Sequence, residues 1–179
     1  MDQPWTILIY TVPAAPSRKR AAIWRELKKV GVVYLRDGVC VLPARGETTA
    51  GLRAIAARVE GFDGEATLVE AARLDPRRAA AIVDQSRRDR AAEYAEIARE
   101  AEGFLEHIRR EMAHREFTLA EVEELEVDRE KLRRWAGQVR ARDYFGGAGA
   151  ARLEELLGRC DEALGTFLEE ASRRDEMAR

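Results

Sequence analysis

Apolar residues occur in short unbroken runs over residues 5–71 and in spaced stripes further along, so the chain predicts two kinds of structure. Residues 5–12 form the first run, rich in β-branched and aromatic side chains, which predicts a strand buried on both faces. Two prolines follow this run. Residues 17–30 then carry apolar positions at helical spacing, and Ser17 stands where an N-cap is expected, which predicts an amphipathic helix.

The rest of this part continues as a small sheet-and-helix pattern. It predicts strands at residues 32–35, 39–42 and 65–71 and a helix at residues 48–59. Asp37 and Gly38 lie between two of these strands, and an Asp-Gly pair supplies the positive φ that a tight hairpin requires. The order is βαββαβ, so we predict an α+β protein with a ferredoxin-like domain over residues 1–74.

Longer helices are predicted over residues 75–179. An Asp-Pro pair at residues 75–76 is a strong helix start. Thr118 and Glu121 match a capping box, which starts a second helix, and a third begins near residue 150. Apolar positions step by three and four along the first of them, at Tyr94, Ile97, Ala101, Phe104, Ile108 and Met112. We therefore predict that this part is an antiparallel helical hairpin or a three-helix coiled extension.

Composition adds a charge asymmetry to this pattern. The net charge of the 179 residues is −2, yet residues 1–46 hold eight Lys or Arg against three acids, a local balance of +5. Cys40 and Cys160 have no disulfide or zinc spacing, so we expect both to be reduced and buried. With no leader and no long apolar run, the sequence predicts a cytoplasmic protein without a membrane span.

Six cations on the predicted helix at residues 17–30 form the most specific charge feature. They are Arg18, Lys19, Arg20, Arg25, Lys28 and Lys29. Three cations in a first helical turn oppose the helix dipole, so a bound anion such as phosphate or an oxyanion would explain their placement. The alternative is an ordinary exposed, solvated helix face. The sequence alone leaves both interpretations open.

Other candidate sites are weaker. His107 and His114 lie on one predicted helix with Glu106 and Glu111 nearby. The two histidines are two helical turns apart, about 10.5 Å, which is too far for one metal ion to bridge them directly. We therefore predict no metal site and no cofactor. No catalytic triad or glycine-rich phosphate loop occurs in the sequence, so no catalytic residue is predicted. The three tryptophans, Trp5, Trp24 and Trp135, fall on predicted inward faces.

Several motifs carry a family resemblance. They read LIYTVP, SRKR, IWRELKKVGVVYL, DGVCVLP, GEATLVEA and AEYAEI in chain order. This pattern resembles the N-terminal domain of the chromate-resistance regulator ChrB up to about residue 115. The resemblance implies a bacterial, chromate-responsive transcriptional regulator. Full-length members carry a further C-terminal domain, so it implies a stand-alone regulator, a partner of a separately encoded C-terminal half, or a trimmed chain.

A more distant similarity connects the first strand and basic helix to the Cas2-like domain of CRISPR adaptation proteins and PaaX-type repressors. In Cas2 nucleases the first strand typically ends in a metal-binding aspartate. Here that region reads Tyr10, Thr11 and Val12. A hydroxyl is a poor substitute for a carboxylate on Mg²⁺, so nuclease activity is not expected.

The leading hypothesis is therefore a non-enzymatic regulator whose basic helix contacts DNA phosphates or the chromate oxyanion. Homodimerisation, or pairing with a separate C-terminal-half protein, is the expected assembly. The alternative is a protein–protein interaction module that acts through its coiled helices, and a Cas2-like nuclease is third.

Overall fold

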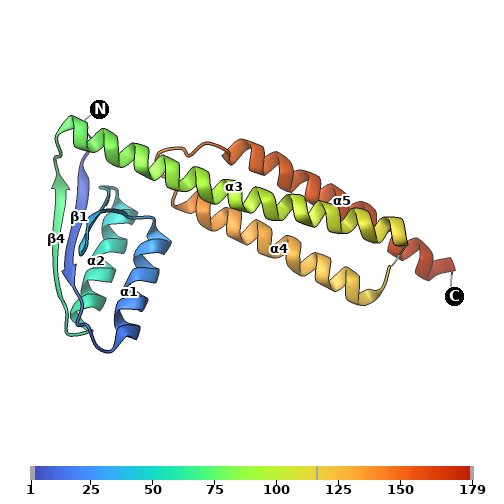
Figure 1. The fold of residues 1–179 in the computed structure, drawn as a ribbon, viewed down its shortest axis with the longest axis horizontal. Coiled ribbons are helices and arrows are strands. Elements are labelled where there is room, and N and C mark those ends of the chain that lie inside the picture. Colours follow the sequence, from blue (N-terminus) through green and yellow to red (C-terminus); the bar gives the residue numbers. More distant parts are fainter. Residues whose placement is uncertain (1–2, 116, 178–179) are drawn as a thin grey trace. The chain divides into compact units, whose positions relative to one another are not determined.

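The computed structural model describes residues 3–115 and 117–177 (Figure 1). Its elements are β1 (Trp5–Thr11), α1 (Ser17–Val30), β2 (Val33–Arg36), β3 (Val39–Pro43), α2 (Gly46–Glu60), β4 (Glu65–Ala72), α3 (Pro76–His114), α4 (Leu119–Ala141) and α5 (Ala150–Met177). This content of strands and helices confirms the predicted α+β class. Most element ends lie within a few residues of the positions predicted from prolines, glycines and caps.

The chain divides into two compact units. The sheet unit contains the residues up to Arg87 together with Arg142–Phe145, and the helical unit contains Arg88–Ala141 and the residues from Gly146 onward. Helix α3 contributes residues to both units. The predicted division into a domain of residues 1–74 and a helical extension of residues 75–179 stays a prediction.

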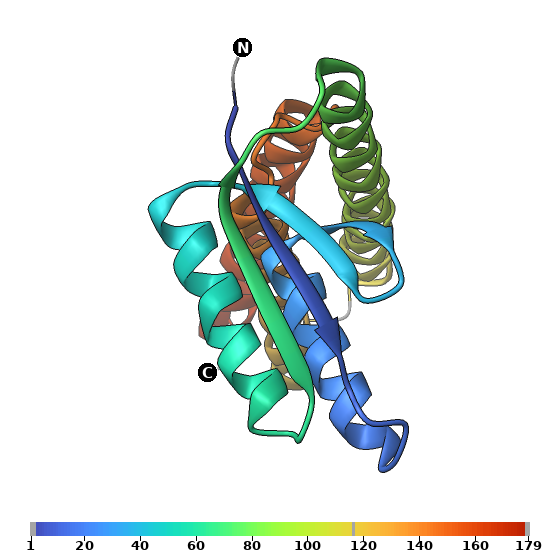
Figure 2. The same ribbon diagram turned by 90° about the vertical axis from the view of Figure 1, so that its left-hand side faces the viewer.

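The sheet unit has one antiparallel sheet in the order β2-β3-β1-β4. β1 pairs with β3 on one side and β4 on the other, and β2 pairs only with β3. In Figure 2, β1 and β4 face the viewer, with α1 and α2 behind them. Both helices bury apolar side chains against the same face of the sheet, including Ile23, Leu27, Leu52, Ile55 and Val59.

Side chains of β1 alternate between the two faces of the sheet, as a strand requires. Leu8 packs in the core beneath α1 and α2. Trp5 lies on the other face, where it packs with Ile82 of α3 and where its ring centroid is 5.8 Å from that of Phe145. Ile9, further along the strand on this second face, is 43% exposed. The prediction that β1 is buried on both faces is therefore wrong at its end, because the covering residues do not extend that far.

The segment Arg142–Phe145 completes the sheet unit. The Tyr144 hydroxyl donates to the carbonyl oxygen of Val30 at 2.9 Å, and Arg45 donates to the carbonyl oxygen of Tyr144 at 3.1 Å. Arg87 donates to the carbonyl oxygen of Phe145 at 2.9 Å. The segment Arg142–Phe145, which lies between α4 and α5 in the sequence, thus adds a ring contact and these three hydrogen bonds to the sheet unit.

The Asp-Gly turn between β2 and β3 forms as predicted. Gly38 has φ of +71°, and an added Cβ would lie 2.5 Å from the carbonyl oxygen of Tyr10. The Tyr10 amide donates to the Gly38 carbonyl oxygen at 2.7 Å. Only glycine fits this position without strain, because the left-handed backbone and the close strand both exclude a side chain.

The helical unit has one apolar core to which α3, α4 and α5 all contribute. On α4, Arg129 and Arg133 both bond Asp161 of α5, and further along, Arg133 and Arg140 both bond Glu154. These pairs advance along α4 as they recede along α5, so these two helices are antiparallel. Among residues 3–115 and 117–177, no helix has both the length and the apolarity that crossing a bilayer demands.

Both cysteines are buried, as predicted. Burial raises the pKa of the Cys40 thiol to about 12 and is the main cause that raises that of Cys160 to about 11. Both thiols are therefore protonated at pH 8, and the thiolate is the reactive form.

We expect neither cysteine to react with a thiol reagent such as Ellman's reagent in the folded protein at pH 8. Both should react once the protein is unfolded in about 8 M urea. Rapid labelling of one thiol before denaturant is added would contradict this placement.

Candidate functional site

Helix α1 carries its cations on the sides that do not pack against the sheet. Ile23 and Leu27 are 1% and 0% exposed, so they fix which side of the helix faces the sheet. The helix begins at Ser17 with Pro16 as its N-cap and without a side-chain capping bond, so the prediction of Ser17 as the cap is wrong by one position. No acid lies in the first turn. The positive end of the helix dipole is therefore not offset locally.

The structure does not bring all six predicted cations together. Arg18, Arg25 and Lys29 lie within about 40° of one another around the helix, at 100° per residue, and all three are exposed. Lys28 is exposed next to this stripe. Arg20 is also exposed but emerges about 160° from Arg18, on another side of the helix. We call Arg18, Arg25, Lys28 and Lys29 the basic face.

Lys19 forms its polar contacts with other residues of the sheet unit. Its Nζ lies 2.8 Å from Oδ2 of Asp63 and donates to the carbonyl oxygen of Phe62 at 3.2 Å. It also stands 5.7 Å from the centroid of the Phe62 ring. The hydrogen bond from Lys19 lowers the pKa of the Asp63 carboxyl. Lys19 therefore fastens the start of α1 to the turn before β4, and it is not part of the basic face.

Trp24 is an aromatic member of this surface that the sequence placed in the core. It is 53% exposed, because it follows Ile23 by 100° and so leaves the buried stripe. Lys28 Nζ lies 5.2 Å from the centroid of its ring. Trp5 is buried as predicted, whereas Trp135 is only partly buried. Helical phase, rather than hydrophobicity, was the signal that could have identified Trp24.

The acids near α1 are directed elsewhere. Glu26, its only acidic residue, lies 2.8 Å from Arg58 of α2. Within the described part of the chain, no carboxylate forms an ion pair with Arg18, Arg25 or Lys29. The basic face therefore combines uncompensated cations with one exposed aromatic ring. Such a surface can bind phosphates and stack on a base or another planar group.

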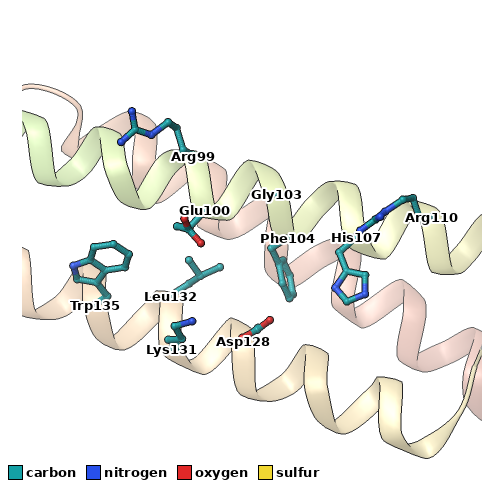
Figure 3. A pocket seen from close by; sticks show the side chains of 10 residues that line it. All are labelled: Arg99, Glu100, Gly103, Phe104, His107, Arg110, Asp128, Lys131, Leu132 and Trp135. Carbon is teal, nitrogen blue, oxygen red and sulfur yellow. The ribbon is translucent and has the colours of Figure 1, made fainter.

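A second candidate is a cleft of about 340 Å³ in the helical unit, between α3 and α4. Figure 3 shows Phe104 and His107 extending from α3 toward α4, whereas Arg99 and Arg110 extend away from it. The acids Glu100 and Asp128 also line the cleft. Its charges are mixed and its arginines do not converge, so it is a weaker anion site than the basic face.

His107 also belongs to a group of metal-ligating side chains beside this cleft. Its Nε2 lies 2.9 Å from Glu121 Oε1 and 3.7 Å from Glu111 Oε1. From the sequence, His107 was considered with His114 and with the nearby Glu106 and Glu111, and Glu121 was assigned to a capping box. The amide of Glu121 does bond the Thr118 hydroxyl at 3.2 Å, but a carboxylate oxygen of Glu121 is at the histidine. The sequence alone could not predict how α4 packs on α3, and this packing is what places Glu121 beside His107.

Comparisons with known proteins agree on one family. A family model described as "Protein ChrB, N-terminal" matches residues 20–176. Protein ChrB from Cupriavidus metallidurans is 28% identical over 155 residues, which cover 86% of this chain and 44% of that protein. The chain thus matches less than half the length of this curated relative. No solved structure matches the chain.

Proposed function

The chain belongs to the ChrB N-terminal domain family, and from this premise we propose that it is a non-enzymatic regulator of chromate resistance that binds DNA through the basic face of α1. The observation that carries the proposal is the alignment of Arg18, Arg25 and Lys29 on one exposed side of α1, where no carboxylate of the described residues forms an ion pair with them. We also propose a ferredoxin-like classification for the sheet unit, supported by its βαββαβ order and the strand order β2-β3-β1-β4.

The spacing of the basic face suits a phosphate backbone. Arg18 and Lys29 are eleven residues apart, so their backbone positions span about 16 Å along α1. Phosphates of one DNA strand recur about every 3.4 Å along the helix axis, so several lie within this span. Contacts of this kind confer affinity and a strong salt dependence without specifying a sequence.

The first test is a charge-removal variant. We expect a triple substitution Arg18→Ala, Arg25→Ala and Lys29→Ala to weaken binding to promoter DNA at least about tenfold at low salt. The slope of log K against log salt should become shallower by about three, close to one for each lost phosphate contact. Fluorescence anisotropy of a labelled duplex at several salt concentrations measures both quantities.

A matched control removes three exposed arginines from the helical unit, through Arg110→Ala, Arg134→Ala and Arg159→Ala. It changes the net charge equally, so it separates the basic face from overall charge. The control should retain the wild-type slope. The DNA proposal fails if wild-type protein shows no binding at low salt, or if the two triple variants bind with the same affinity and slope.

The second candidate, a protein-interaction module of the helices, has less to support it. An interaction surface on the helices needs exposed apolar side chains, yet Leu157 and Leu164 of α5 are only 1% and 6% exposed within the helical unit itself. Leu119 and Val127 of α4 remain exposed at 74% and 65% and are the observation that favours this alternative. Substituting both with aspartate would abolish capture of a partner under this alternative and leave DNA binding unchanged.

Catalysis is not part of the proposal. β1 ends with Tyr10 and Thr11, where a Cas2-type nuclease would carry an aspartate. We propose that the chain has no Mg²⁺-dependent nuclease activity, and cleavage of DNA by purified protein with Mg²⁺ would refute this.

A further inference from the structure

Three metal-ligating side chains meet where the end of α3 lies against the start of α4. His107 and Glu111 are one helical turn apart, so both project from the same side of α3. Glu121 comes from the first turn of α4. One donor atom from each of the three residues lies within 4.8 Å of the other two. The group therefore combines an imidazole nitrogen with two carboxylate oxygens from two different helices.

The charges in this group are unbalanced. Two carboxylates face one imidazole, so the group carries a net negative charge even when His107 is protonated. The three side chains are only 24%, 14% and 20% exposed for His107, Glu111 and Glu121. Partial burial weakens the screening of this excess charge by water. Arg110 and Asp128, which line the adjoining cleft, have opposite charges, and Figure 3 shows Arg110 extending away from α4.

The contact between His107 and Glu121 is also not an ordinary hydrogen bond. Glu121 Oε1 is shielded from solvent and has no hydrogen-bond partner within the described residues, although His107 Nε2 lies 2.9 Å away. The ring N–H is therefore not directed at this oxygen. A buried carboxylate oxygen without a donor is costly. An ion that accepts lone pairs from both atoms would remove that cost.

We propose that His107, Glu111 and Glu121 bind one divalent transition-metal ion of the Zn²⁺ type. Zn²⁺ binds histidine nitrogen and carboxylate oxygen at about 2.0–2.2 Å, so donor atoms around one ion lie about 3–4.4 Å apart. The observed separations need only small side-chain adjustments to meet that range. The imidazole donor favours a transition metal over Mg²⁺, which prefers oxygen ligands and retains water. Three protein ligands leave at least one coordination position for water.

The ion would link the C-terminal end of α3 to the N-terminal end of α4. None of its three ligands belongs to the basic face, so the two sites can be tested with separate substitutions. Binding to the folded form alone stabilises it by mass action. The expected signature is therefore stoichiometric binding together with a higher melting temperature.

The test uses an untagged protein of residues 1–179, stripped with EDTA and titrated with ZnCl₂ by isothermal calorimetry. We expect one Zn²⁺ per chain, and binding at least about tenfold weaker in His107→Gln and in Glu121→Gln, as for loss of one ligand from a small set. His114→Gln is the matched control, since His114 is exposed on the same helix seven residues further on. It should bind Zn²⁺ like wild type, and MgCl₂ at the same concentration should give no binding.

Each variant is also melted with and without Zn²⁺, so that a folding defect is recognised from the metal-free melting temperature. A Zn²⁺-dependent rise in wild type and His114→Gln, absent from His107→Gln and Glu121→Gln, supports the proposal. It is overturned if wild type binds no stoichiometric Zn²⁺, if both ligand variants bind as tightly as wild type, or if His114→Gln alone abolishes binding. Loss of DNA binding in the basic-face variant would affect none of these outcomes.

Discussion

Replacing Phe167 with alanine is expected to lower the free energy of unfolding of the helical unit by about 3–5 kcal/mol, the range for a buried phenylalanine. Phe167 is 0% exposed on α5, and its ring centroid lies 5.1 Å from that of Phe117. The substitution removes both the apolar burial and the ring contact and leaves a cavity where three helices meet. Urea unfolding followed by circular dichroism measures the loss.

Glu169→Ala is the control for this experiment, because Glu169 is exposed two residues further along the same helix. A surface substitution of this kind should change stability by no more than about 0.5 kcal/mol. A change below about 1 kcal/mol for Phe167→Ala, well under the range for buried phenylalanine, would show that the core is not packed as described.

Replacing Gly38 with alanine is expected to destabilise the sheet unit through two separate effects. The left-handed backbone costs a residue with a Cβ about 1–2 kcal/mol. The added Cβ would also be 2.5 Å from the Tyr10 carbonyl oxygen, and such overpacking typically costs about 1–3 kcal/mol. Because that oxygen belongs to the backbone of β1, no side-chain rotation relieves the contact. Thermal and urea unfolding should both show the loss.

Gly46→Ala provides the comparison within the same unit. An added Cβ at Gly46 meets nothing within 4 Å, and the residue is the first of α2. This variant should be as stable as wild type or more stable by up to about 1 kcal/mol, since alanine restricts the unfolded chain. If Gly38→Ala behaves like Gly46→Ala, the hairpin does not approach β1 as described.

Local chemistry in the sequence was enough to predict the elements of the sheet unit. The Asp-Gly pair predicted the hairpin, the prolines after β1 predicted where that strand ends, and the Asp-Pro pair predicted that α3 begins at Pro76. Glycine and proline act through the backbone of their own residue, so these signals do not depend on distant contacts. The buried stripe of α1, with Ile23 and Leu27, was also predictable from local sequence, because the spacing of apolar residues along one helix determines which side is buried.

The site required information that local patterns do not contain. Lys19 looked like the other cations of α1, but Asp63, more than forty residues later, engages it. Trp24 looked like core because it is large and apolar, although its helical phase places it among cations. Glu121 joined His107 only through the packing of α4 on α3. For Lys19 and Glu121 a contact distant in sequence decided the role of the side chain, whereas the exposure of Trp24 follows from its own helical phase.

The segment Arg142–Phe145 has a consequence for the order of synthesis. A chain leaves the ribosome from its N-terminus, and compact parts fold as they become complete. Every strand of the sheet emerges early, but the ring that packs on Trp5 and the hydroxyl that bonds Val30 are translated only after all of α4. Until then the nascent sheet unit lacks both the ring contact at Trp5 and the hydrogen bond at Val30. A fragment that ends at Arg87 would keep that incomplete state permanently.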